Sequence, residues 1–167
     1  MREELDKKLC EKYPLLFKNR YGNPQETLMC FGFEHGDGWY NIIDVLCGML
    51  YGDYRWEKER YDYLVEKGVG AVFFGKELLT QEVIDAAKTK MDEEAAKVPV
   101  VSQIKEKFGT LRFYVDRATD KHYNYIAMAE AMSARTCEVC GKPGLIRGRS
   151  WLYTACDEHT REEDLVE

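Results

Sequence analysis

Three cysteines and one histidine near the end of the chain have the spacing of metal ligands. The pattern is Cys137-x-x-Cys140, then fifteen residues, then Cys156-x-x-His159. A two-residue gap lets one tight turn present two thiolates to one ion, and Zn²⁺ prefers four sulfur or nitrogen ligands in a tetrahedron. We therefore predict a zinc site, with iron as the alternative that thiolates also accept. Because four protein ligands leave no position for water or substrate, this zinc is expected to be structural.

Cations and aromatic residues occur together in two further segments, a predicted hairpin and the zinc-binding segment. Guanidinium groups match phosphate oxygens and aromatic faces stack on bases, so these residues suit a nucleotide or a short single strand. The predicted ligand-binding residues are Lys105, Lys107, Arg112, Tyr114, Arg147, Arg149 and Trp151. The alternative is that they are solvated, with the arginines paired to acids such as Glu138, Asp157 and Glu158.

The segment HGDGW at 35–39 is a third candidate, because a histidine and an aspartate beside glycines can supply a base and a hydrogen-bond acceptor. We favour the alternative of a helix start, in which Asp37 is the N-cap and Trp39 packs inside. A dyad of His35 with Cys47 would lack a third residue to orient it. We therefore predict no catalytic residue, and an enzyme is the less favoured class.

The apolar pattern predicts the elements that position these residues. Helices are expected at 2–13, after Asp37 through residue 50, and at 54–67, 80–97 and 119–134, with a strand at 27–33. The runs 100–108 and 111–115 flank Gly109 and Thr110, which predicts a hairpin with a type II′ turn. Leu111, Phe113 and Val115 should point to one side of its second strand, and Arg112 and Tyr114 to the other.

These elements predict an α+β fold with a small antiparallel sheet containing the hairpin, flanked by several helices. We assign residues 1–134 to an α+β core domain and residues 135–167 to a zinc-binding module packed on that core.

Composition excludes some classes of function. The chain has 167 residues, 45% of them hydrophobic, and a formal net charge of −6, which disfavours duplex nucleic acid. No apolar run is long enough to cross a membrane and the first residues are not a signal sequence, so we expect an intracellular protein. The remaining cysteines, Cys10, Cys30 and Cys47, are predicted to be free thiols.

Three blocks of the sequence resemble a family of small, uncharacterised proteins encoded by bacteriophages and prophages. The blocks are CFGFEHGDGWYNIIDVLC at 30–47, QIKEKFGTLRFYV at 103–115 and TCEVCGKPGLIRGRSWLYTACDEH at 136–159, with the weaker PLLFKNRYG at 14–22. The resemblance implies a phage origin and a zinc-binding C-terminal part, but no activity. In that family the stretch between the first two blocks is often shorter than 48–102 here, so an insertion is expected.

The leading hypothesis is a non-enzymatic phage accessory protein in the host cytoplasm. Its structural zinc would support a surface that binds a host protein or a small nucleotide-like ligand, with countering of host defence as one role. The alternatives are a phage protein that binds single-stranded nucleic acid and, less favoured, an enzyme that processes nucleotides. The aromatic-rich stretch 51–63 is compatible with a homo-oligomer.

Overall fold

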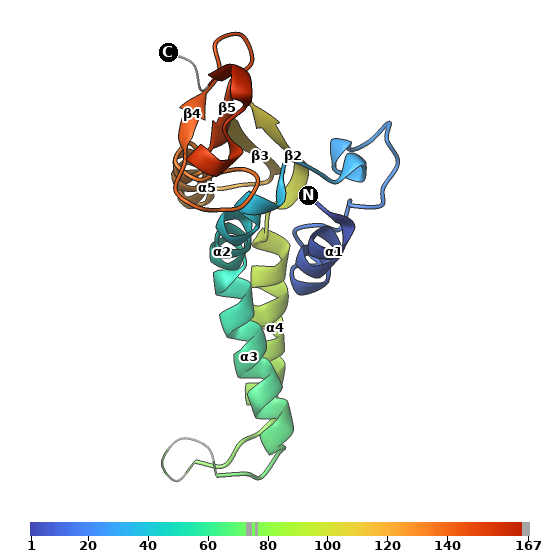
Figure 1. Cartoon of the computed structure of the whole chain (residues 1–167). Coiled ribbons are helices and arrows are strands. Elements are labelled where there is room, and N and C mark those ends of the chain that lie inside the picture. Colours follow the sequence, from blue (N-terminus) through green and yellow to red (C-terminus); the bar gives the residue numbers. More distant parts are fainter. Residues whose placement is uncertain (73–74, 76, 165–167) are drawn as a thin grey trace. The chain divides into compact units, whose positions relative to one another are not determined.

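The hairpin predicted from the alternating residues of 100–115 forms two strands of a three-stranded sheet (Figure 1). The computed structural model describes residues 1–72, 75 and 77–164, and in it β2 (Val100–Lys107) pairs antiparallel with β3 (Thr110–Asp116). On the other edge of β2, β1 (Phe33–Glu34) forms a short parallel pair with Ile104 and Lys105. The sheet is therefore mixed, and its strand order is β1-β2-β3.

Helices and this sheet together confirm the predicted α+β class. The chain divides into two compact units, one of Met1–Leu50 with Pro99–Glu167 and one of Tyr51–Val98. The second unit falls within the stretch 48–102 that we expect to be an insertion. A separate module beginning at residue 135 stays a prediction, and its residues 165–167 lie outside the described part of the chain.

The hairpin turn lies one residue earlier than predicted. Lys107 pairs with Thr110, which leaves Phe108 and Gly109 at the turn, and their φ angles are +56° and +77°. Positive φ at both central residues is the type I′ pattern, whose twist matches that of the strands, so the predicted II′ turn was wrong. The predicted alternation is confirmed, because Leu111 and Phe113 are buried while Tyr114 is exposed.

The strand predicted at 27–33 was wrong except at its last residue. Residues Leu28–Phe31 form a 3₁₀ turn, η1, which is capped by Thr27, because the Met29 N–H donates to the Thr27 hydroxyl. Gly32 then reverses the chain with φ +81° before β1 begins. The hydroxyl cap offers the backbone an alternative to strand pairing that apolar composition alone does not reveal.

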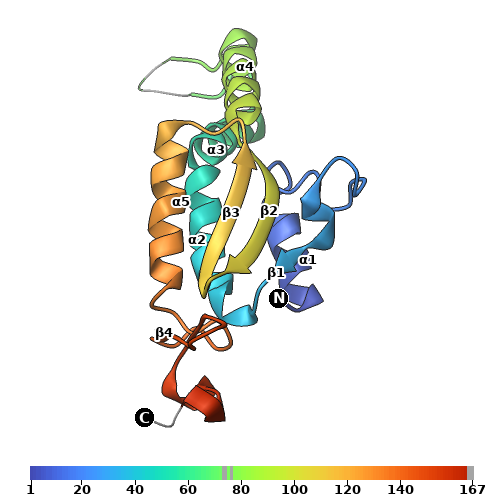
Figure 2. The same ribbon diagram turned by 90° about the horizontal axis from the view of Figure 1, so that it is seen from above.

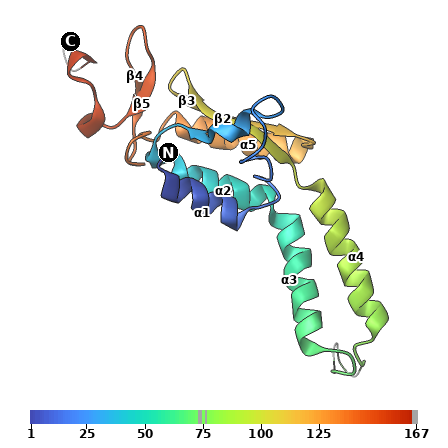
Figure 3. The same ribbon diagram turned by 90° about the vertical axis from the view of Figure 1, so that its right-hand side faces the viewer.

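Three helices of the first unit accompany its sheet. They are α1 (Glu3–Lys12), α2 (Tyr40–Leu50) and α5 (Asp120–Ser133), which confirms the helices predicted there. Figure 3 shows α1 and α2 along one side of the sheet, and α5 contacts both α2 and β3. The core contains buried residues from every one of these elements: Leu9, Ile43, Leu46, Ile104, Leu111, Phe113 and Ile126.

The helix α5 runs on the β3 side of the sheet (Figure 2), and two of its side chains bind the outer edge of β3. The Leu111 N–H donates to the Ser133 hydroxyl at 2.8 Å, and the Phe113 N–H donates to the Glu130 carboxylate at 3.0 Å. Unpaired N–H groups on an edge strand attract other strands. These two hydrogen bonds hold α5 beside the hairpin and satisfy two backbone N–H groups of that edge, so another strand cannot pair with them.

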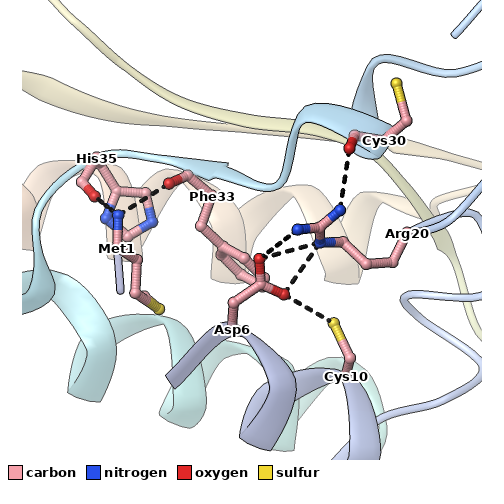
Figure 4. A network of polar contacts seen from close by, with 7 residues as sticks. All are labelled: Met1, Asp6, Cys10, Arg20, Cys30, Phe33 and His35. Atoms are coloured by element: carbon pink, nitrogen blue, oxygen red, sulfur yellow. Dashed lines mark hydrogen bonds and ion pairs between the residues drawn. The ribbon is translucent and has the colours of Figure 1, made fainter. Parts of the chain in front are cut away.

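A buried ion pair attaches the segment after α1 to that helix (Figure 4). The Arg20 guanidinium donates to both oxygens of Asp6, at 2.7 Å for the closest pair, and to the Cys30 carbonyl at 3.0 Å. The Cys10 thiol lies 3.4 Å from the same carboxylate, and burial together with that negative charge raises its pKa to about 12. Cys10, Cys30 and Cys47 are free thiols, as predicted.

The second unit consists of two helices, α3 (Gly52–Lys67) and α4 (Gln81–Lys97), and both were predicted. Gly68, with φ +75°, ends α3. A small cluster of Leu64, Leu79, Ile84 and Ala87, with Tyr61 and Val83 beside it, packs between them. Across the described residues, no helix is both long and apolar enough to span a membrane.

Short elements make up the described part of the chain after α5. They are the two-stranded sheet of β4 (Leu145–Arg147) and β5 (Tyr153–Ala155), followed by the 3₁₀ turns η3 (Asp157–His159) and η4 (Glu162–Asp164). Because these elements are so short, the stability of this segment depends on its contacts with the rest of the unit and on any metal ion that its cysteines bind.

Candidate metal centre and the adjoining pocket

The structure brings the four predicted metal ligands together. The sulfur atoms of Cys137, Cys140 and Cys156 and one ring nitrogen of His159 all lie within 4.8 Å of one another. The Cys140 and Cys156 sulfurs are 3.7 Å apart, and His159 Nδ1 is 3.7 Å from Cys137 Sγ and 3.2 Å from Cys156 Sγ. Zinc–sulfur bonds of about 2.3 Å in a tetrahedron would separate two sulfurs by about 3.8 Å. The donor set and its spacing therefore fit one four-coordinate metal ion.

Two local turns of the backbone present these ligands. The Gly141 N–H donates to the Cys137 carbonyl at 2.9 Å, and Gly141 has φ +77°, which lets the chain turn back directly after Cys140. On the other side, Cys156 precedes η3, and the His159 N–H donates to the Cys156 carbonyl at 3.1 Å. A single 3₁₀ turn thus carries the second pair of ligands.

The backbone also favours the thiolate form of Cys137. Burial opposes ionisation, but hydrogen bonds from the backbone of Cys156, Cys140 and Val139 outweigh it and lower the Cys137 pKa to about 7. A thiolate is the form that binds a metal ion. The site thus holds at least one ligand close to its binding state at neutral pH.

The turn of residues 136–141, here called the knuckle, is attached to the GDGW segment of residues 36–39. The Gly38 N–H donates to the Glu138 carbonyl at 2.7 Å, and the Gly36 N–H donates to the Glu138 carboxylate at 2.8 Å. The buried Trp39 indole N–H donates to the Thr136 carbonyl at 2.8 Å. Three hydrogen bonds therefore connect the metal ligands to the start of α2.

Close packing at this contact explains why both residues flanking Asp37 are glycine. A Cβ atom on Gly38 would overlap the Cys137 carbonyl oxygen, and one on Gly36 would overlap the Glu138 carbonyl oxygen. Sequence reasoning assigned this segment to a helix start and missed the close approach. No local signal could have found it, because Gly38 lies in a 3₁₀ turn and the contact joins segments about one hundred residues apart.

His35 and Asp37 do not form the base and acceptor that we considered. The His35 Nδ1 lies 2.7 Å from the Gly36 carbonyl oxygen, and its Nε2 is buried with no hydrogen-bond partner. Neither nitrogen therefore activates Cys47, and burial raises the pKa of that thiol. Asp37 is not the predicted N-cap either, because Gly36 precedes the 3₁₀ turn η2 (Asp37–Trp39) and the Asp37 carboxylate binds Arg2 instead.

Three of the seven predicted ligand-binding residues line one surface pocket. This hairpin pocket has a volume of about 430 Å³ and is lined by Glu106, Lys107, Phe108, Arg149, Ser150, Trp151 and Leu152. The contact that creates it joins the hairpin turn to β5, where the Thr154 hydroxyl donates to the Gly109 carbonyl. Phe108 and Trp151 are 66% and 67% exposed. Sequence reasoning missed Phe108, because it was assigned to the strand and not to the turn.

The other four residues lie elsewhere. The side chains of Lys105 and Tyr114 lie on the same face of the sheet as that of Lys107, and Lys105 pairs with Arg112 in the strand register. The Lys105 ammonium is 5.7 Å from the Tyr114 ring centre. Arg112 is bound to its own strand through Thr110 and the Leu111 carbonyl. Arg147 forms an ion pair with Asp157, which matches the alternative in which arginines pair with neighbouring acids.

Comparison with known proteins found no protein-family model, curated protein or solved structure that matches this chain.

Proposed function

We propose that this protein binds a small nucleotide-like ligand in the hairpin pocket, and that a structural zinc ion at the Cys/His site positions one wall of that pocket. The observation that carries the proposal is the convergence of Lys107, Arg149 and Trp151, from two separate segments, on one hollow. Its volume lies in the range that small-molecule sites occupy, about 300–1,000 Å³.

The chemistry of the lining supports a ligand with an anionic and an aromatic part. Lys107 and Arg149 supply two cations, and the nearby Glu106 carboxylate accepts the Gly109 N–H at 2.6 Å. Phe108 and Trp151 expose aromatic faces on which a base can stack. The net charge of −6 disfavours a long phosphate backbone but leaves a short ligand at a local basic site possible.

Zinc is the metal that best suits three thiolates and an imidazole in a closed tetrahedral set. Its role would be structural. Cys156, one of the four ligands, directly follows β5, and Arg149–Trp151 precede that strand, so a metal that fixes β5 would also fix the loop that carries Trp151.

The biological setting follows from the resemblance to phage-encoded proteins. A protein that binds a nucleotide without converting it would lower the free concentration of that nucleotide in the host cytoplasm, and defence systems that signal through nucleotides would be blunted. A host protein partner is compatible with the same surface.

A second candidate, binding of single-stranded nucleic acid, is favoured by one specific observation. Lys105, Arg112 and Tyr114 extend the basic and aromatic surface from Lys107 along the same sheet face. A strand longer than the pocket would contact these residues as well, and its binding would weaken steeply with salt.

Isothermal titration calorimetry of the metal-loaded protein with mono-, di- and cyclic nucleotides tests the proposal. We expect saturable heat with at least one of them and its loss in Trp151→Ala and Arg149→Ala. Trp56→Ala and Arg55→Ala are the matched controls, because both residues lie exposed on α3, Trp56 with 70% exposure. The absence of heat with every nucleotide, in a folded protein that holds its metal, would contradict the proposal.

A further inference from the structure

The loop residues Arg149, Ser150 and Trp151 line two hollows and not one. Besides the hairpin pocket, they line a second hollow of about 310 Å³, here called the C-terminal pocket, together with Gly148, Arg161, Glu163 and Asp164. The exposed Trp151 side chain is therefore a shared wall, and Arg149 is a cation common to both.

The lining of the C-terminal pocket is already ordered by contacts within the protein. The Arg161 guanidinium lies 4.1 Å from the Tyr153 ring centre, and the Tyr153 hydroxyl donates to the Asp164 carboxylate at 2.7 Å. The Arg161 N–H in turn donates to the Tyr153 hydroxyl at 2.9 Å. Groups held in place before binding lose less conformational entropy when a ligand arrives.

The two hollows differ in charge. The hairpin pocket combines Lys107 with the single acid Glu106, whereas the C-terminal pocket contains two carboxylates, Glu163 and Asp164, beside Arg161. Carboxylates accept hydrogen bonds from amino groups and repel a second phosphate. The C-terminal pocket is therefore suited to the amino-bearing edge of a base, and the anionic group belongs at Arg149.

We propose that the ligand is a dinucleotide whose bases lie on opposite faces of Trp151. One base contacts Phe108 in the hairpin pocket, the linking phosphate pairs with Arg149, and the second base, an amino-bearing one, faces Glu163 and Asp164. This inference rests on the proposed function and narrows it, because a mononucleotide fills only one of the two hollows.

Titration of AMP, ApA and UpU into the metal-loaded protein tests this inference. ApA is expected to bind about tenfold or more tightly than AMP, because a second base gains its own stacking contact with the indole. ApA should also bind more tightly than UpU, whose bases carry no amino group. In Trp151→Ala, ApA should lose its binding heat just as AMP does, so that no advantage of ApA over AMP remains.

Glu163→Ala tests the second hollow separately, and Glu162→Ala is its matched control, an exposed neighbour outside the lining. Glu163→Ala should reduce the preference for ApA over UpU and leave AMP affinity unchanged, and Glu162→Ala should change neither.

If AMP and ApA bind with affinities within threefold of each other, the dinucleotide inference fails while the proposed function stands. If an adenosine tetranucleotide binds about tenfold or more tightly than ApA, the ligand is a longer strand and the inference also fails. If none of these nucleotides binds, both proposals fail.

Discussion

Two parts of the segment that contains the metal ligands, residues 136–159, differ in how they contact the rest of the protein. The knuckle, residues 136–141, packs against GDGW so closely that two glycines are required, and a buried tryptophan donates to its backbone. The loop that carries Arg149 and Trp151 instead exposes its aromatic and cationic side chains to two hollows. The knuckle therefore contributes to the stability of the fold, and the loop contributes a candidate binding surface. Substitutions in the knuckle contact and in the loop should separate these two effects.

Gly38→Ala should cause the largest loss of stability. Its Cβ would overlap the Cys137 carbonyl oxygen, and backbone on both sides leaves no side chain that can move away. We expect the free energy of unfolding to fall by more than about 3 kcal/mol, measured by urea denaturation. Gly52→Ala is the control: no atom lies within 4 Å of that Cβ position, and it should be neutral or slightly stabilising. Equal losses of stability in Gly38→Ala and Gly52→Ala would contradict the close contact between Gly38 and the knuckle.

His35 should make stability depend on pH. Burial lowers its pKa to about 4, with the nearby amino terminus acting in the same direction and Asp37 against it. Since the unfolded imidazole titrates near 6.5, the unfolded state binds the proton first, and stability falls as pH decreases from about 6.5 to 4. The loss should reach about 3 kcal/mol. Because acid also weakens thiolate–metal bonds, the measurement is the difference between the unfolding curves of the wild type and His35→Phe at each pH. A constant difference from pH 7 to pH 4 would show that His35 does not titrate as described.

Trp39→Phe removes the hydrogen bond to the knuckle while keeping a large aromatic side chain. The Thr136 carbonyl would lose its donor, and the smaller ring would leave a gap. We expect a loss of about 2 kcal/mol in thermal or urea unfolding. Trp56→Phe, at an exposed position on α3, should stay within about 0.5 kcal/mol of the wild type.

Trp151→Ala should have the smallest effect on stability and the largest on ligand binding. Its side chain is 67% exposed, so the free energy of unfolding should change by no more than about 0.5 kcal/mol. Loss of metal or a large loss of stability in this variant would mean that Trp151 contributes to the packing of the fold and not to a binding surface.

Local patterns in the sequence predicted most of the elements. The helices at 3–12, 40–50, 52–67, 81–97 and 120–133 follow apolar periodicity and end at residues such as Gly68. Residues 27–33 misled the prediction, because a side-chain cap at Thr27 and a reversal at Gly32 override an apolar composition. The hairpin turn was predicted one residue too late, because Phe108 adopts a positive φ that bulky residues seldom adopt.

The candidate site could be predicted only where its residues are close in sequence. The metal ligands follow from two short motifs, whereas the contact between GDGW and the knuckle joins residues about one hundred positions apart. The hairpin pocket likewise depends on the contact of Thr154 with Gly109, which no local pattern encodes. Cations and aromatics led to the prediction of a nucleotide-like ligand, but only tertiary contacts determine that Arg147 pairs with Asp157 while Arg149 lines the pocket.

X-ray absorption at the zinc edge, together with the metal content of protein purified without added metal, is the decisive test of the zinc site. We expect about one zinc ion per chain with three sulfur ligands at about 2.3 Å and one nitrogen at about 2.0 Å. Less than about half an equivalent of any transition metal, or a coordination shell made of oxygen, would contradict this expectation.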